Sequence, residues 1–586
     1  MKKILSAMLA LLAVGGCNSV PEGISTLPQN TQSEQLGMSD FEIAEETDAF
    51  SNECDISLGE TVNINGEGAV IDDNCITISE SGIYKITGTL ENGMIYISCK
   101  ETVKLVFDNA GINNDNGSAI ISESEKLIIE CEADTTNFLS DGKEYTYKRS
   151  FENAEKHEAT LYAEGKLLLA GKGKLSVSGN YSESITAGEL TVKGNLQVDA
   201  EDNGIIADGG ISCLGAHISL TAEKDGMKTD SSISAADSSI TISAENDGIQ
   251  AENELNASGV VFDISTSGDI ESDSELSSKG IKAGKLILSD CTVTVNSTDH
   301  SVKSDGTADI SGGEMVLSSS MGKGITAEGA LTVNDAEITV LMSNEGIESK
   351  STLTINSGNL NITSTDDGIN TGGDDVTSDH SIIINGGTVV VNAEGDGLDS
   401  NGDIAVNGGV VVVYGPVSAG NSPLDWGEMG FSLKVTGGKV LAMGDMGMMM
   451  NTSSDCFMSS SLNAKEGDVI TVADSNGNVI ISAVTPKSAQ GVIFSGVQDC
   501  RVYKNGTVDG TADEYGIITS GTVTGGTEIE AGMAGGFGGK GGRHPQDFPT
   551  GKPDREIPQD GMPAIPEDGM PMMPGRDPQM ENGTEV

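Results

Sequence analysis

A glycine-centred turn recurs about every 22 residues along the middle of the chain, and this period restricts the fold more than any other feature of the sequence. The steps between successive turn centres are 22, 22, 32, 21, 23, 22, 22 and 29 residues. Insertions over 267–278 and 372–380 account for the two long steps. Self-similarity at such a period is typical of stacked repeat architectures. The turn centres are Gly204, Gly226, Gly248, Gly280, Ser301, Gly324, Gly346, Gly368 and Gly397.

Between the turns, apolar and polar residues alternate in short runs such as Leu331-Thr332-Val333 and Leu353-Thr354-Ile355. A period of two predicts strands with one apolar face. Such short strands cannot close a core within one repeat, but repeats stacked as coils ~4.8 Å apart bury a continuous core. We therefore predict an all-β chain, a right-handed parallel β-helix with about 22 residues per coil. A β-propeller would require a period of roughly 40–45 residues with an aromatic signature, which is absent.

Strands of the same character flank the regular array. Residues 62–169 contain them without a clean period, and we assign this stretch to the first coils. The pattern changes after Tyr414, and from Gly532 onward the chain is rich in Gly, Pro and Met, a composition that does not form a strand ladder. We expect the β-helix over 51–455, a small β cap over 456–530 and a disordered tail over 531–586.

The amino end has the layout of an export signal. Lys2 and Lys3 precede an apolar run, and small residues lead to Cys17. These small residues resemble a bacterial lipobox, which implies cleavage before Cys17 and lipidation of its thiol. The alternative is an ordinary signal peptide with an incidental cysteine. We expect a lipoprotein signal over 1–17, a flexible tether over 18–50 and a chain anchored by lipid at the cell surface, outside the cytoplasmic membrane.

Eight cysteines follow Cys17. Export permits disulfides, but spacing does not fix their connectivity, and an anaerobic habitat would leave the thiols reduced. No Cys-x-x-Cys motif or Cys/His cluster supports a zinc site. The pairs that we consider plausible are Cys54/Cys75, Cys99/Cys131 and Cys456/Cys500.

The chain has 89 acidic and 33 basic residues and a formal net charge of −56, which argues against a nucleic-acid binder. Many of the acids recur at a fixed phase of the repeat. In stacked coils they would form files of like charge, which are costly unless lysines or cations neutralise them. Calcium suits such files because it takes six to eight oxygen ligands in flexible geometry. Examples are Asp208, Asp230, Glu252, Asp305 and Glu328 after the turns, and Glu201, Glu223 and Glu245 before them.

The richest group of candidate calcium ligands spans two neighbouring turns. For any single Asp-Gly the simpler interpretation is a turn, because Asx side chains cap turns and tolerate left-handed backbone. For this group we favour calcium, because six aspartates exceed what turns need. A second acidic loop lies in the insertion and contains Asp269, Glu271 and Asp273. The main group consists of Asp366, Asp367, Asn370, Asp374, Asp375, Asp396, Asp399 and Asn401.

Four stretches are the most specific motifs of the chain: Lys279-Gly280-Ile281-Lys282-Ala283, Asp366-Asp367-Gly368-Ile369-Asn370, Gly395-Asp396-Gly397-Leu398-Asp399-Ser400-Asn401-Gly402 and Leu424-Asp425-Trp426. Together they resemble the bacterial "carbohydrate-binding domain-containing" β-helix family, whose fold is similar to that of pectate lyases. The resemblance covers roughly residues 59–529. Membership would imply a secreted or surface-attached, calcium-binding domain that holds plant cell-wall polysaccharides, including cellulose and acidic pectin-like glycans.

We expect a polysaccharide-binding monomer without assigned catalytic residues. Lys228, Lys282, Tyr414 and Trp426 are the candidate sugar contacts. One alternative is a pectate-type lyase, in which calcium holds the uronate carboxylate and Lys228 or Lys282 acts as the base. An inverting hydrolase built on clustered aspartates and a purely structural adhesin or spacer are the others.

Overall fold

The computed structural model describes residues 50, 52–146, 158–270, 277–373, 379–418, 420–427, 430–446, 456–496 and 499–533. Across these ranges the regular secondary structure consists of strands, which confirms the predicted all-β class. The predicted signal segment with Cys17, nearly all of the tether and the tail from residue 534 lie outside the described residues. Within the described ranges, no helix is long and apolar enough to cross a membrane.

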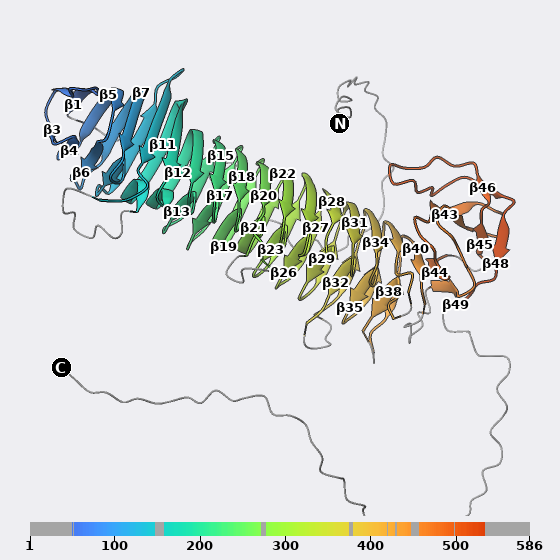
Figure 1. The fold of residues 1–586 in the computed structure, drawn as a ribbon. Helices are drawn as coiled ribbons and strands as arrows, with labels where there is room; N and C mark the ends of the chain where they lie inside the picture. The colour runs from blue at the N-terminus through green and yellow to red at the C-terminus, as the bar shows by residue number, and fades with distance from the viewer. Residues whose placement is uncertain are drawn as a thin grey trace, which may run out of the picture. The chain divides into compact units, whose positions relative to one another are not determined.

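Each repeat contributes three strands, and each strand pairs in parallel with its equivalent one repeat later. Strand β13 (Ile205–Ala207) pairs with β16 (Met227–Thr229), β14 (Ile211–Leu214) with β17 (Ile233–Ala236), and β15 (His217–Ala222) with β18 (Ser239–Ala244). The register advances by one full repeat, so Ile205 lies beside Met227. Figure 1 shows the resulting row of successive coils.

The three files of parallel strands run through most of the described chain, and several long strands bend from one file into another. The first file contains β4 (Cys75–Ile78), β6 (Met94–Ile97), β8 (Ile120–Ser122), β11 (Ala159–Gly179), β12 (Glu183–Ala200), β13, β16, β19 (Ile249–Ser258), β21 (Ile281–Ser289), β23 (Val302–Ser304), β26 (Ile325–Ala327), β29 (Ile347–Ser349), β32 (Ile369–Thr371), β35 (Leu398–Ser400) and β38 (Leu424–Trp426).

The second file begins with β1 (Glu53–Ser57) and ends with β39 (Leu433–Val435). It contains β1, β5 (Gly82–Leu90), β7 (Val103–Asn114), β9 (Lys126–Cys131), β11, β12, β14, β17, β19, β21, β24 (Ala308–Ser311), β27 (Leu331–Asn334), β30 (Leu353–Ile355), β33 (Ile382–Ile384), β36 (Ile404–Val406) and β39.

In the third file, strands such as β15 and β18 alternate outward-facing and buried residues over six positions. This file contains β5, β7, β10 (Thr136–Asp141), β11, β12, β15, β18, β20 (Val261–Thr266), β22 (Thr292–Ser297), β25 (Glu314–Ser319), β28 (Ala336–Met342), β31 (Gly358–Ser364), β34 (Thr388–Ala393), β37 (Val410–Tyr414) and β40 (Lys439–Gly444).

Antiparallel strands flank the files at both ends. Near the amino end, β2 (Asn63–Asn65) pairs with β1, and β3 (Ala69–Asp72) pairs with β4. At the other end, β44 (Gly491–Ser495) pairs with β40 and with β41 (Cys456–Ser459), which also pairs with β49 (Gly532–Met533). The remaining strands are β42 (Val469–Ala473), β43 (Val479–Val484), β45 (Arg501–Lys504), β46 (Thr507–Val508), β47 (Val523–Thr524) and β48 (Thr527–Ile529).

The alternation in sequence becomes alternation in burial. In β18, Ile240, Ile242 and Ala244 are buried while the residues between them face outward. Side chains of this kind form one apolar core that continues from Cys54 to Ile493. A second core packs the face of β34, β37 and β40 against the strands of the carboxyl-terminal part.

The turn glycines are required by the close approach of successive coils. A Cβ at Gly226 would lie 2.5 Å from the carbonyl oxygen of Gly248 and 2.6 Å from Cγ2 of Ile242. A side chain therefore does not fit without moving the backbone of the next coil.

The eight described cysteines are all free, and seven of them are buried. None of the three pairs that the sequence suggested is joined by a disulfide. The alternative of reduced thiols agrees with this arrangement, in which the core is built without cross-links.

Candidate functional site

One file of side chains runs along the first strands of the coils, two residues after each turn centre. Strand register places these residues side by side, and we call this file the outer ladder. It carries lysines over its first part and acidic or amide groups over its last part. Its members from the Gly226 turn onward are Lys228, Gln250, Lys282, Lys303, Thr326, Glu348, Asn370 and Asp399, and Asp425 continues the register beyond the last turn glycine.

At the acidic end of the outer ladder, three carboxylates converge. Carboxylate oxygens of Asp367, Asp396 and Asp399 lie within 4.8 Å of one another, and each side chain is half-buried. We call this group the acidic trio. Asp399 belongs to the ladder itself, whereas the other two aspartates come from the turns immediately before β32 and β35. The structure thus brings together three of the residues that the sequence marked as calcium ligands.

Two members of the trio also serve the turns. Oδ1 of Asp367 accepts the backbone N–H of Asp396 at 2.7 Å, and Oδ1 of Asp396 accepts that of Ser422. The same bond recurs earlier in the array, where Oδ1 of Asp225 accepts the N–H of Asp247 at 3.1 Å. The turn-capping interpretation therefore applies to these aspartates.

Burial and mutual repulsion raise the pKa of every member of the trio. Burial, followed by the charges of Asp367, Asp396 and Asp425, raises the pKa of Asp399 to about 8. Burial also raises the pKa of Asp367 to about 7, although the N–H of Asp396 opposes the shift. The pKa of Asp396 rises to about 6 through burial, opposed by the N–H of Ser422 and increased by nearby carboxylates. Full ionisation near neutral pH therefore requires compensating positive charge.

In earlier coils, lysines pair with aspartates of the turns. Lys228 Nζ lies 3.0 Å from Oδ2 of Asp225, and Lys279 Nζ lies 2.7 Å from Oδ2 of Asp299. Among the described residues, by contrast, no lysine, arginine or histidine forms an ion pair with Asp367, Asp396 or Asp399. Within the described part of the chain, the trio thus carries three close carboxylates without an ion-pair partner.

Between the two parts of the ladder lies a buried ion-pair network that the sequence analysis missed. The carboxylate of Glu348, only 2% exposed, contacts Lys323 Nζ at 2.5 Å, Lys350 Nζ, and the hydroxyl of Thr326 at 2.8 Å. Burial alone would raise the pKa of Glu348, but the hydrogen bonds from Lys323 and Lys350 outweigh it and lower the pKa. The available signal was Lys350, two residues after Glu348 and therefore on the same side of an extended chain, together with Lys323 one residue before the preceding turn glycine.

A hollow of about 520 Å³ lies beside the trio. Asp399 and Asn370, neighbours on the outer ladder, contribute to its wall, as does Asn401, whose Nδ2 donates to the carbonyl oxygen of Gly373 at 3.0 Å. Carboxylate and amide oxygens, which bind hard cations, line the hollow together with nitrogen groups that can donate to sugar hydroxyls. The lining residues are Glu328, Lys350, Asn370, Gly372, Gly373, Asp399 and Asn401.

The other predicted calcium ligands do not join the trio. Asp366 precedes Asp367 and adds its charge to the neighbouring carboxylates. Asp208 and Asp230 belong to much earlier coils, and seven coil spacings separate the Lys228 rung from that of Asp399, or about 34 Å. Asp269 lies at the edge of the insertion, in a different coil. Asp273 and Asp374 lie outside the described residues.

The four predicted sugar contacts differ in location: the two lysines lie on the outer ladder, whereas the two aromatic residues are buried. Lys228 and Lys282 both stand on the outer ladder, and the ion pair with Asp225 keeps Lys228 charged: although burial lowers the pKa, that hydrogen bond outweighs it. Tyr414 and Trp426 are 7% and 6% exposed and pack in the cores. Their burial leaves neither ring a face on which a sugar could stack.

The burial of Trp426 follows from its phase in the repeat. It lies beside Ser400 in the register of β35 and β38, at the inward-facing third position of a three-residue strand. An exposed aromatic ring lies elsewhere: Tyr181, 40% exposed, stacks on the partly buried Tyr145 with ring centroids 4.5 Å apart. Tyr145 in turn donates its hydroxyl to Oδ2 of Asp141 at 2.7 Å.

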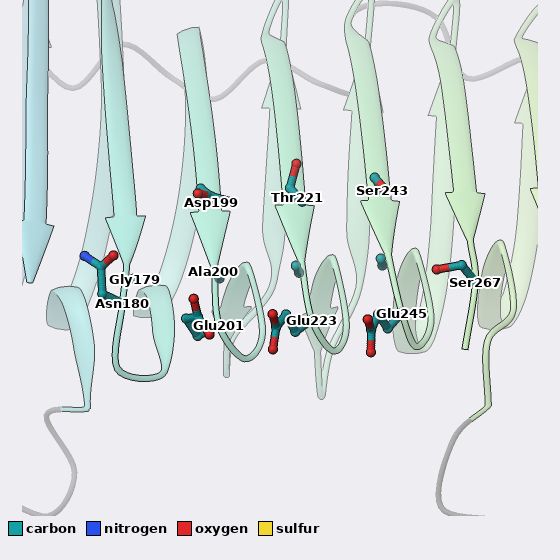
Figure 2. Close-up of a pocket in the computed structure, with 12 residues that line it drawn as sticks. Gly179, Asn180, Asp199, Ala200, Glu201, Thr221, Glu223, Ser243, Glu245 and Ser267 are labelled. Atoms are coloured by element: carbon teal, nitrogen blue, oxygen red, sulfur yellow. The ribbon is translucent and has the colours of Figure 1, made fainter. Parts of the chain in front are cut away.

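A second hollow, of about 290 Å³, follows a file of glutamates early in the array. Figure 2 shows Glu201, Glu223 and Glu245 in a row on successive coils, with Asn180 at one end and Ser267 at the other. These are the glutamates that precede the first three turn glycines by three residues. Because strand spacing is ~4.8 Å, the row concentrates negative charge along one corner of the coils.

Comparison with known proteins adds a family. A family model described as "Carbohydrate-binding domain-containing protein" matches residues 72–322 and 316–482. A protein of that description from Acetivibrio thermocellus is 28% identical over 210 residues, which cover 34% of this chain and 65% of the relative. The chain therefore matches less than two thirds of that relative's length. A solved structure, described as the polysaccharide lyase-like protein from C. thermocellum in a gadolinium derivative, is 25% identical. It covers 40% of this chain and 96% of its own, with a TM-score of 0.37.

Proposed function

The chain belongs to the carbohydrate-binding domain-containing protein family, and on that premise we propose that it binds polysaccharide through calcium held by the acidic trio. The observation that carries the proposal is the convergence of Asp367, Asp396 and Asp399 without a cationic partner among the described residues. Three close carboxylates with raised pKa values are stabilised either by protons or by a cation. At neutral pH in an extracytoplasmic setting, a divalent cation is the natural partner.

The donor set suits calcium. The trio supplies carboxylate oxygens, and the amide side chains of Asn370 and Asn401 stand beside it in the wall of the hollow. Calcium takes such oxygen ligands in flexible numbers, whereas zinc prefers the nitrogen and sulfur ligands that this group lacks. Bound here, calcium would neutralise the trio and offer coordination positions to carboxylate or hydroxyl oxygens of a sugar.

An acidic, pectin-like glycan fits this site best, with cellulosic glycan as the neutral alternative. A chain with a net charge of −56 repels a polyanion, so the divalent cation serves as the bridge between the two. Lys282 and Lys228, on the same ladder, are the proposed contacts for sugar carboxylates. Tyr181 takes the place of Tyr414 and Trp426 as the exposed ring for sugar stacking.

The sequence supports three further parts of the proposal. The stacked parallel strands form a right-handed parallel β-helix, the handedness that parallel crossover connections strongly favour. Cys17 carries the lipid that anchors the protein, and the chain acts as a monomer at the cell surface. Export is consistent with calcium loading, since extracellular modules work with sites of modest affinity.

The test is retention of the purified chain on de-esterified pectate and on cellulose, with calcium and with EGTA, beside an Asp399→Asn variant. Calcium-dependent retention on pectate that Asp399→Asn abolishes supports the proposal. Equal retention with and without EGTA would contradict it. An ultraviolet assay for unsaturated product runs in parallel, and calcium-dependent product would replace the binding function by that of a lyase. Failure to bind either glycan would leave a structural adhesin.

A further inference from the structure

The side-chain amide of Asn370 has a fixed orientation. Its Nδ2 donates a hydrogen bond of 3.2 Å to Oε2 of Glu345. An ionised carboxylate only accepts hydrogen bonds, so the amide must present its NH₂ group to Glu345 and its carbonyl Oδ1 elsewhere. The chemistry of the partner therefore assigns the two ends of this amide, which geometry alone leaves open.

Glu345 is itself held in place. Lys323 Nζ lies 3.2 Å from Oε2 of Glu345 and 2.5 Å from Oε2 of Glu348. The side chains of Lys323 and Glu345 are 17% and 14% exposed, so solvent screens this contact only in part. A chain of contacts thus runs from the buried Glu348 through Lys323 and Glu345 to the amide of Asn370.

Asn370 stands at the edge of the acidic trio. It pairs in register with Asp399 across β32 and β35, and the two residues share the wall of the hollow of about 520 Å³. Asn370 lies in β32 and follows Asp367, in the turn before that strand, by three residues. Its amide is a neutral oxygen donor on the ladder, next to Asp399.

We propose that Glu345, clamped by Lys323, is a positioning residue that directs Oδ1 of Asn370 to the cation of the acidic trio as a neutral fourth ligand. The inference rests on the proposed calcium site and adds the residues that preorganise it. Outer contacts of this kind fix ligand orientation, and their loss typically weakens metal binding by about 10–100-fold. Lys323 and Glu345 act through Asn370 and do not touch the cation.

Two variants of Glu345 distinguish its role in orienting the Asn370 amide from the effect of its negative charge. Glu345→Gln removes the negative charge but keeps an acceptor oxygen for Nδ2 of Asn370. Glu345→Met removes both and keeps a side chain of similar length. Terbium(III) alone serves as the probe for the full chain, with affinity from titration and the number of bound waters from luminescence lifetimes in H₂O and D₂O.

We expect Glu345→Met to bind terbium about tenfold or more weaker than Glu345→Gln and to retain one additional water on the ion. In the Glu345→Met background, Asn370→Asp should restore the water count, because a carboxylate presents an oxygen in either orientation. Thermal melts of the apo proteins verify that both variants fold.

Equal affinity and equal water counts in the Met and Gln variants would overturn the positioning role. A separate variant, Asp399→Asn, tests whether the acidic trio binds the cation, on which the positioning inference rests. If Asp399→Asn leaves terbium binding unchanged, the proposed cation site fails. If Asp399→Asn weakens binding while the two Glu345 variants behave alike, only the positioning inference fails.

Discussion

The backbone N–H of Asp396 donates a hydrogen bond of 2.7 Å to Oδ1 of Asp367, its counterpart one coil earlier. This bond fixes the distance between two turns and also holds two carboxylates side by side. A contact that stabilises the stack therefore builds a site of concentrated negative charge. The same hydrogen bond therefore accounts for the role of Asp367 in the turn and for the closeness of two carboxylates that we propose as cation ligands.

Removal of one charge from the trio should separate calcium binding from stability. We expect Asp399→Asn to weaken calcium binding at least tenfold and to leave the calcium-free protein as stable as the parent or more so, because repulsion within the trio falls. Calcium at 100 times its dissociation constant should stabilise the parent by about 2.7 kcal/mol, and the variant much less at that concentration. Urea unfolding with calcium and with EGTA measures both effects. A variant whose apo form is markedly less stable would contradict this account.

The raised pKa values predict how stability depends on pH. The pKa values of Asp396, Asp367 and Asp399 are about 6, 7 and 8 in the folded chain, above the ~3.9 of an unfolded aspartate. The folded state therefore holds protons that the unfolded state releases. Without calcium, the contribution of these groups is fully present below about pH 4 and is lost as pH rises through 6 to 8. Calcium affinity should rise over the same range because protons and the cation compete.

The matched control for this pH effect is Asp399→Asn, which removes one of the three shifted groups. The free energy of unfolding, measured in EGTA from pH 5 to pH 9, should fall more steeply with pH in the parent than in the variant. Parallel curves would show that the trio does not titrate in this range.

Substitution of the buried Trp426 should mainly reduce stability, whereas substitution of the exposed Tyr181 should mainly reduce glycan retention. Trp426→Ala removes a core side chain and should cost about 3–5 kcal/mol of stability. Tyr181→Ala removes an exposed ring that stacks on Tyr145 and should cost only about 1 kcal/mol. Under folding conditions we expect glycan retention to fall for Tyr181→Ala. Retention that is lost in a folded Trp426→Ala protein but unchanged in Tyr181→Ala would reverse these assignments.

A turn glycine should resist substitution where coils meet. Gly226→Ala places a methyl group against the carbonyl oxygen of Gly248 and the side chain of Ile242, and we expect a loss of about 1–3 kcal/mol. Gly59→Ala is the control, because its Cβ would meet nothing closer than an oxygen of Thr61 at 3.8 Å. Denaturant midpoints measure both, and similar values for the two variants would disprove the close-approach argument.

Most of the fold could be predicted because its information is local and repeated. Alternation in runs such as Leu331-Thr332-Val333 specifies a strand, and the glycine period specifies where each coil turns. Stacking then follows because neighbouring repeats present identical edges and apolar faces. The burial of Trp426 could also be predicted from its position in the repeat. Trp426 is the third residue of β38, and its neighbour Ser400, the third residue of β35, is buried too.

The candidate site was predictable only in part. Asp367, Asp396 and Asp399 stood out as an acidic group, but Asp208 and Asp230 carried the same sequence signal and lie in distant coils. The free cysteines show the same limit, because spacing along the chain does not report the direction of a side chain.

The amino-acid sequence by itself determined the all-β class, the period of the coils and the aspartates at their turns, because these depend on neighbours within one repeat. Only the tertiary structure decided which carboxylates converge and which are neutralised, since that depends on register across coils. Glu348 received two lysines from neighbouring turns, whereas the trio received none among the described residues. The orientation of the Asn370 amide likewise depends on a contact between coils, because its Nδ2 donates to Glu345 of the preceding coil.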